Sequence, residues 1–230
     1  NDQIGAVYEH RLGANDTLRL VAYTGTRDIT QFLALPVGAQ IPATNSGGVI
    51  NLDRKFDGAN IRWTHQFAAP LTFTAGVDRS GYENFTGAGA TQVLGVQGAL
   101  RRSEDNTVQN LDPYAQIEWQ PSKDWNVIAG LRHSKVKFKS EDFFTNGPTN
   151  LDDSGKKDYS HTNPVLGVLY KINPQLNVYG NFGKGFETPT FAELAYKADA
   201  AGVLVSGLNF DLKPSESKNF ELGLKAKVND

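Results

Sequence analysis

Two alternating stretches of sequence joined by a short turn indicate the fold: ANIRWTHQF (residues 59–67), AAP (68–70) and LTFTAGVD (71–78). Apolar residues and His65 occupy the odd positions from 59 to 67, and polar residues occupy the even positions. In the second stretch the odd positions from 71 to 77 are again apolar. Successive side chains of a strand point to opposite faces, so this segment predicts a β-hairpin with one apolar and one polar face.

Short turns and long polar connections alternate along the whole chain. Turns rich in Gly, Pro, Asn or Asp lie at residues 13–16, 68–70, 121–124 and 173–175, and a further turn would begin at residues 229–230. The longer connections lie at residues 31–57, 81–110, 139–160 and 184–216. Loops of that length are uncommon in compact soluble domains, and their alternation with tight turns is typical of outer-membrane barrels.

We therefore predict an all-β chain, an antiparallel up-and-down segment of a transmembrane β-barrel, with residues 1–230 forming part of a single barrel domain. The short turns would face the periplasm and the long loops the cell exterior. The prediction comprises nine strands, at about residues 3–12, 17–30, 58–67, 71–80, 111–120, 125–138, 163–172, 176–183 and 217–228.

The alternation alone does not show whether lipid or a protein core covers the apolar face, because a soluble β-sandwich shows the same alternation. Trp63, Trp119 and Trp125 all stand within a few residues of a short turn, as does Tyr170, where the interfacial aromatic girdle of a barrel belongs. The strands are also long for a globular protein. These features favour lipid over a protein core.

Composition excludes several other classes of protein. No run of about 18 apolar residues is present, so the sequence predicts no transmembrane helix. The formal charge of −2 gives no footprint for nucleic acid, and the absence of cysteine excludes disulfides, thiolate metal sites and cysteine nucleophiles. The chain begins with neither Met nor a signal peptide, so we expect a mature, trimmed or fragmentary polypeptide.

Two motifs near the C-terminal end carry a resemblance to a known family. NVYGNFGKGFETPTFAEL (residues 177–194) is followed about twenty residues later by LKPSESKNFELGLK (residues 212–225). Together they resemble the corresponding motifs of TonB-dependent outer-membrane receptors. The positions that carry the resemblance are Gly183, Gly185, Phe186, Pro189, Glu193, Leu194, Pro214, Glu221, Leu222 and Gly223.

The resemblance implies a barrel of about 22 strands closed by an N-terminal plug. No plug is recognisable in this sequence, which looks like the middle of such a barrel. The implied function is import of a scarce nutrient, with a ferric siderophore as the leading substrate, in the outer membrane of a Gram-negative bacterium. The implied partners are outer-membrane lipid, the ferric chelate, and the TonB energy-coupling protein acting through the missing plug region. The family is not enzymatic, and no cofactor is implied.

Two other functions remain open at this stage. One is a passive or adhesive outer-membrane barrel without energy coupling. The other is a soluble carbohydrate-binding β-domain, which the alternation alone also permits.

Candidate sites follow from the motif and from the loops. Thr190 and Glu193 form a potential capping box for a helical turn over residues 191–196. The sequence contains no catalytic motif, and the scattered histidines predict no metal site. Aromatic and cationic side chains suit contact with an anionic chelate. The candidates are Arg79, Tyr82, Phe85, Arg101, Arg102, Phe143, Phe144 and Tyr196.

Nine strands that do not close a barrel leave two unpaired edges. We therefore expect the isolated fragment either to fold its sheet on itself or to associate edge to edge. Either arrangement would bury Ile61, Trp63, Phe73, Ile117 and Leu222.

Overall fold

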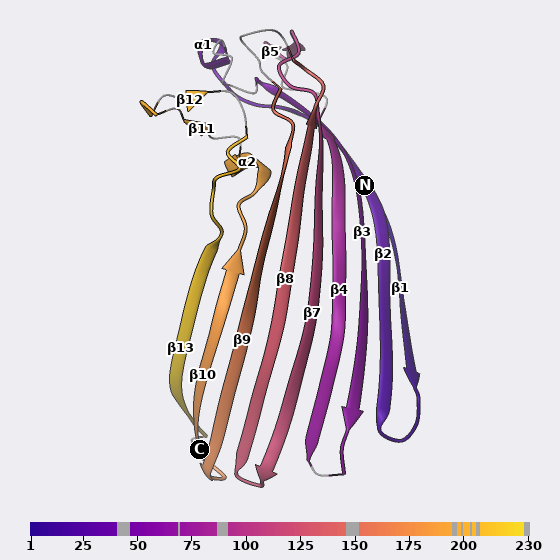
Figure 1. Ribbon diagram of the computed structural model, residues 1–230, viewed down its shortest axis with the longest axis vertical. Coiled ribbons are helices and arrows are strands. Elements are labelled where there is room, and N and C mark those ends of the chain that lie inside the picture. The colour runs from indigo at the N-terminus through magenta and orange to yellow at the C-terminus, as the bar shows by residue number, and fades with distance from the viewer. Residues whose placement is uncertain are drawn as a thin grey trace.

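The computed structural model shows one curved, nine-stranded antiparallel sheet in chain order (Figure 1). It describes residues 1–40, 47–68, 70–86, 92–145, 152–194, 197–198, 200–202, 204–205 and 208–227. The strands of the sheet are β1 (Asp2–Arg11), β2 (Asp16–Phe32), β3 (Val49–Gln66), β4 (Leu71–Thr86), β7 (Glu104–Ser122), β8 (Trp125–Asp142), β9 (Gly155–Asn173), β10 (Leu176–Glu187) and β13 (Ser215–Ala226).

Short elements occupy the connections at one end of this sheet. Two small hairpins lie there, one made of β5 (Gln92–Val93) and β6 (Val96–Gln97), the other of β11 (Lys197–Ala198) and β12 (Leu204–Val205). The helical turns α1 (Val37–Gln40) and α2 (Phe191–Leu194) lie at the same end (Figure 1). No helix in the described part of the chain is long and apolar enough to cross a membrane.

The predicted rhythm of turns is confirmed. All four tight turns lie at the lower end of the sheet and the long connections lie at the upper end (Figure 1). We call these the turn end and the loop end. The predicted nine strands are also confirmed, including their order and antiparallel pairing.

The predicted strand bounds at the loop end were wrong, because several strands run much further. β3 begins at Val49 rather than near residue 58, β7 at Glu104 rather than near 111, and β9 at Gly155 rather than near 163. The connections shrink to residues 33–48, 87–103, 143–154 and 188–214. Beyond the apolar band the outward positions turn polar, whereas inward positions such as Ile50, Phe56 and Val108 are apolar, so the apolar pattern changes faces. Backbone pairing does not need apolar outward side chains and continues.

Cross-strand register shows that the apolar positions share one face. Directly paired residues point to the same side of a sheet. Ile61 pairs with Leu20 on β2 and with Val77 on β4, while Phe182 pairs with Leu166 on β9 and with Phe220 on β13. The result is a continuous apolar band on what we call the outer face. Its members include Ile4, Tyr8, Leu18, Trp63, Phe73, Ala75, Ala115, Ile117, Leu131, Val168, Val178, Leu222 and Leu224.

Aromatic residues mark the turn end of this outer band. The Trp125 and Tyr170 rings lie 4.6 Å apart between centroids, and the Trp63 and Phe73 rings lie 5.8 Å apart. The indole Nε1 of Trp63 donates to Asp16 at 2.9 Å. These residues occupy the positions that a girdle at a membrane–water interface would use.

The expectation that the fragment folds on itself was wrong. β1 and β13 are the two edges of the sheet and do not pair with one another. Ile61 remains 55 % exposed and Leu222 72 % exposed. Nine strands describe only an arc, so the edges lie at opposite ends of the wall (Figure 1). Association edge to edge stays a prediction.

The outer band can be tested by placing a charge on either face of β3. In the full-length protein that carries this chain, Ile61→Arg should lower the free energy of unfolding by about 2–4 kcal/mol in lipid vesicles, because the guanidinium would lie in hydrocarbon. Thr64→Arg is the matched control on the opposite face and should cost less than about 1 kcal/mol. Urea titration measures both, and equal losses would contradict the assignment of faces.

Candidate functional site

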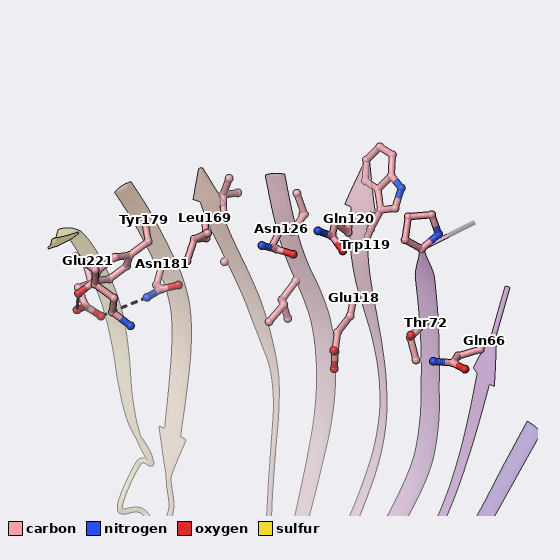
Figure 2. A pocket seen from close by; sticks show the side chains of 16 residues that line it. Gln66, Thr72, Glu118, Trp119, Gln120, Asn126, Leu169, Tyr179, Asn181 and Glu221 are labelled. Carbon is pink, nitrogen blue, oxygen red and sulfur yellow. Dashed lines mark hydrogen bonds between the residues drawn. The ribbon is translucent and has the colours of Figure 1, made fainter. Parts of the chain in front are cut away.

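The inner face of the sheet is polar and hollowed near the turn end (Figure 2). A recess of about 760 Å³ extends from β3 across to β13. Side chains that point away from the apolar band line most of it, so the recess lies on the concave side of the wall. They include Gln66, Thr72, Glu118, Gln120, Asn126, Tyr179, Asn181 and Glu221.

A hydrogen-bonded cluster builds the β10–β13 side of this recess. The Tyr179 hydroxyl donates to Glu221 Oε1 at 2.7 Å, and the amide of Asn181 donates to Glu221 Oε2 at 3.3 Å (Figure 2). Lys225 Nζ lies 5.2 Å from the centre of the Tyr179 ring. Glu221 therefore faces the recess, whereas the next motif residue, Leu222, points to the outer face.

The motif glycine at position 223 is explained by close packing. Gly223 pairs directly with Tyr179, whose ring lies where a Cβ on Gly223 would stand. The same arrangement recurs twice along the inner face, where the Tyr23 ring covers Gly58 and the Tyr114 ring covers Gly76. These glycines let an aromatic ring lie flat on the neighbouring strand.

An ionic network crosses the middle of the inner face. Arg132 Nη2 donates to Asp112 Oδ2 at 2.7 Å, and Arg132 Nη1 lies 3.3 Å from Asp78 Oδ2. The side chain of Asn60 donates to the same Asp78 carboxylate. Sequence reasoning missed this network, although its members stand at inward positions of neighbouring strands and could have been found once the register was known.

The connection between β10 and β13 covers the inner face at the loop end. Leu194 and Leu208 are buried against Val108, Val136 and Phe138 of β7 and β8. The Tyr159 hydroxyl donates to the carbonyl of Leu212 at 2.9 Å, and the Phe191 and Phe138 rings lie 5.3 Å apart. The second half of the first motif therefore anchors a loop to the inside of the wall.

The predicted capping box is present at α2. The backbone N–H of Thr190 donates to Glu193 Oε2 at 2.7 Å, and the backbone N–H of Glu193 donates to Thr190 Oγ1 at 3.3 Å. The bonds that the backbone N–H and the hydroxyl of Thr190 donate to the Glu193 carboxylate hold the pKa of that carboxyl below its usual value. The described helix covers Phe191–Leu194, and the remaining predicted residues, 195–196, lie outside the described residues.

Other motif positions surround this loop. Phe186 stacks on the His161 ring with 5.4 Å between centroids, and Pro189 and Glu193 line a shallow hollow of about 320 Å³ with Leu212. Pro214 comes directly before β13, where a missing N–H is tolerated. Gly183 and Gly185 lie in β10, in register with Asn219 and Ser217 of β13.

The predicted ligand-contact residues do not form one cluster. Tyr82 packs against the loop-end core beneath Arg54, whose guanidinium carbon lies 4.4 Å from the ring centre. Arg102 Nε lies 2.6 Å from the buried carboxylate of Glu104. Arg79 differs from both, because it lies on the outer face in an ion pair with Asp57.

The remaining candidates lie at the loop end. Phe143 is exposed, and the backbone N–H of Phe144 donates to Asp142 at 2.9 Å. Arg101 lies in the connection that leads into β7. Phe85 belongs to β4, but its side chain lies outside the described residues, as does the whole of Tyr196. Among the described residues, no group of three His, Asp or Glu side chains could hold a metal ion.

The packing at position 223 can be tested with an added methyl group. Gly223→Ala in the full-length protein should displace the Tyr179 ring and cost about 1–3 kcal/mol in the free energy of unfolding. Gly180→Ala is the control, because a Cβ there meets no atom closer than 3.6 Å. Urea unfolding of both variants measures the difference. A Gly223 variant as stable as the Gly180 variant would disprove this role.

The capping box predicts a pH dependence of the loop. The lowered pKa of Glu193 means that its carboxylate stabilises the folded turn above the unfolded pKa of about 4.3, and that this contribution is lost as pH falls through the folded value. Hydrogen exchange of the Thr190 amide, corrected for its intrinsic rate, should show protection at pH 6 that declines below pH 4. Glu193→Gln should abolish this decline, and an unchanged pH profile in that variant would argue against the assignment.

A protein-family model and several known proteins are similar to this chain. The family model described as TonB dependent receptor-like, beta-barrel, matches residues 1–230. A vitamin B12 transporter, BtuB of Photobacterium profundum, is 34 % identical over 87 residues, which are 38 % of this chain and 13 % of that protein.

Solved structures of similar fold cover almost the whole chain. The ferric yersiniabactin uptake receptor FyuA of Yersinia pestis has a TM-score of 0.69 at 16 % identity, covering 99 % of this chain and 33 % of its own. The copper transporter OprC has a TM-score of 0.75 at 13 % identity, covering 99 % and 36 %. The chain thus spans about a third of the length of these receptors. Because the family model matches every residue, this chain belongs to the TonB-dependent receptors of the Gram-negative outer membrane, as a section of their β-barrel.

Proposed function

We propose that this chain is a section of the barrel wall of a receptor that imports a scarce nutrient, with a ferric siderophore as the leading substrate. The observation that carries the proposal is the division of the wall into an apolar outer face and a polar inner face that is covered by an anchored loop at one end. Such a wall separates lipid from a polar lumen. The proposed function includes no catalytic step.

The two ends of the inner face suit different tasks. The loop end offers aromatic and cationic groups. They are Tyr82, Arg54, Arg101 and Arg102, together with Phe143 and Phe144. Those groups suit an anionic chelate, which guanidinium groups and rings can both contact. At the turn end, the polar recess suits packing against a plug domain.

We assign residues 1–230 to a single barrel domain whose plug lies elsewhere in the parent protein. Energy coupling would then act through TonB and that plug rather than through the wall itself. The outer band would contact lipid, as its uncovered Ile61 and Leu222 suggest.

A cobalamin is the second candidate substrate. The 34 % identity to a vitamin B12 transporter over 87 residues is the observation that favours it. A passive or adhesive barrel would differ from both candidates, because it would import no substrate by energy-coupled transport.

Ligand binding by the full receptor distinguishes these candidates. Purified receptor should be titrated with a ferric siderophore panel, cobalamin and haem, using quenching of tryptophan fluorescence. We expect binding of a ferric siderophore. Phe143→Ser should weaken that binding several-fold, because stacking of one ring contributes about 0.5–1.5 kcal/mol.

The control for this variant is Leu94→Ser, which removes an apolar side chain that is 98 % exposed at the tip of the β5–β6 hairpin. It should leave binding unchanged. Binding of cobalamin alone would select the second candidate. Binding of none of these ligands, together with normal growth of a deletion strain under iron limitation, would overturn the proposal.

A further inference from the structure

The first two long connections at the loop end carry no charged side chain. From residue 29 to residue 52, and again from residue 84 to residue 100, the sequence contains no Asp, Glu, Lys, Arg or His. The connection between β10 and β13 differs, because it contains Glu193, Lys197, Asp199, Asp211 and Lys213. These two uncharged segments can therefore be joined to each other only by apolar contacts and by hydrogen bonds between neutral groups.

The β5–β6 hairpin in the second of these connections needs support from outside itself. Each of its strands is two residues long, and an isolated two-stranded hairpin is at best marginally stable in water. Its apolar side chains bury little surface, since Leu94 is 98 % exposed and Val96 is 70 % exposed. Leu94 also adopts a φ of +52°, a conformation that is unfavourable for a residue with a Cβ atom. Contacts with another part of the chain must therefore hold the hairpin in place.

Gln40, the last residue of α1 in the first connection, supplies those contacts. Its side-chain Nε2 donates to the carbonyl of Gln92 at 3.1 Å, and the backbone N–H of Gln92 donates to Gln40 Oε1 at 2.7 Å. One side-chain amide thus pairs both backbone groups of the first residue of β5, as a neighbouring strand would do. In return, Gln92 Nε2 donates to the carbonyl of Leu33 at 2.6 Å. We call the side chains of Gln40 and Gln92 the glutamine clasp.

The glutamine clasp is closely packed and fully hydrogen-bonded. Gln40 is 2 % exposed, and its Nε2 also donates to the carbonyl of Leu35 at 2.9 Å. Gln92 Oε1 accepts a hydrogen bond from the backbone N–H of Gly95 at 3.0 Å. A Cβ atom on Gly48 would lie 2.6 Å from Gln92 Cγ and 2.9 Å from Gln40 Oε1, so the absence of a side chain there leaves room for the pair. Loss of either glutamine would leave polar groups of the other connection without a partner, which is costly where they are buried.

The clasp attaches the hairpin to strands other than its own. The backbone N–H of Leu33 donates to the carbonyl of Gly48 at 2.7 Å, which continues the β2–β3 pairing beyond Phe32 and Val49. Leu33 also accepts the bond from Gln92, so the clasp rests on this extension of the ladder. The hairpin lies between β4 and β7 in the chain, but it is anchored to the upper ends of β2 and β3.

We propose that the glutamine clasp makes the β2–β3 and β4–β7 connections one conformational unit, whose two parts open and reorganise together. A molecule that displaces the β5–β6 hairpin must then displace Gln40 and α1 as well, so that an event at the tip of one connection reaches the ends of β2 and β3. Every bond of the clasp joins neutral groups, so the coupling should be the same at low and high salt. It is independent of the substrate that the full-length protein takes.

Hydrogen exchange of the full-length protein, followed by mass spectrometry of its peptides, tests this coupling. Gln92→Leu breaks the clasp without changing the first connection, and residues 33–40 should then exchange about tenfold faster than in the wild type. Gln40→Leu should accelerate residues 92–97 by a similar factor. Peptides of β7 and β8 should exchange as in the wild type in both variants, because the wall does not depend on the clasp.

The matched control is Gln97→Leu, which makes the same replacement at an exposed side chain of the same hairpin and should leave residues 33–40 unchanged. Acceleration confined to the substituted connection in each clasp variant would show that the two connections move independently and would overturn the proposal. Equal acceleration of residues 33–40 in the control, or loss of the effect in high salt, would also overturn it.

A double variant keeps the test decisive if a single replacement also disturbs the wall. In Gln40→Leu/Gln92→Leu the clasp is lost only once, so its effect on residues 33–40 and 92–97 should be no larger than that of the more severe single variant. Additive effects of the two replacements would mean that Gln40 and Gln92 act separately, and the proposal would then be wrong.

Discussion

Backbone hydrogen bonding is the constraint on which the rest of the wall depends. Hydrocarbon offers no partner to an N–H or C=O group, so every strand inside the bilayer must be paired on both sides. The continuous antiparallel ladder supplies those bonds on both sides of every strand from β2 to β10 and on one side of β1 and β13. Once the ladder fixes the register, it also decides which side chains lie on the apolar outer face and which lie on the polar inner face. Ile61 and Thr64 lie on opposite faces of the sheet for this reason.

The inner face shows how a long sheet can be both polar and well packed. Three tyrosine rings cover Gly58, Gly76 and Gly223. Each ring fills the space that a side chain on the glycine would occupy. The Arg132 network supplies paired charge in the middle of the wall. These contacts lie between neighbouring strands, so they stabilise the register and shape the lumen at the same time.

The loop end combines an anchored connection with the side chains that we propose as ligand contacts. The β10–β13 connection is tied down by buried leucines and by the bond from Tyr159 to Leu212, which explains why motif residues as far apart as Phe186 and Glu193 belong to one unit. The aromatic residues of the outer band lie at the opposite, turn end, so the two ends of the wall differ in chemistry.

Local sequence was enough to predict the hairpin rhythm, the nine strands, the apolar face and the capping box of Thr190 with Glu193. Each of these depends on local spacing, such as the alternation from residue 59 to residue 67, which the chain carries without reference to distant residues. It did not reveal the loop-end extensions of β3 and β9, because the outward positions turn polar there and the apolar side chains, such as Phe56 and Tyr159, lie on the inner face while the ladder continues. Long-range pairing in the folded wall placed Tyr179 on Gly223, joined Arg132 to Asp78 and Asp112, and put Arg79 on the outer face. Those relations are set by cross-strand register between residues far apart in the chain, and a one-residue slip would move each side chain to the other face.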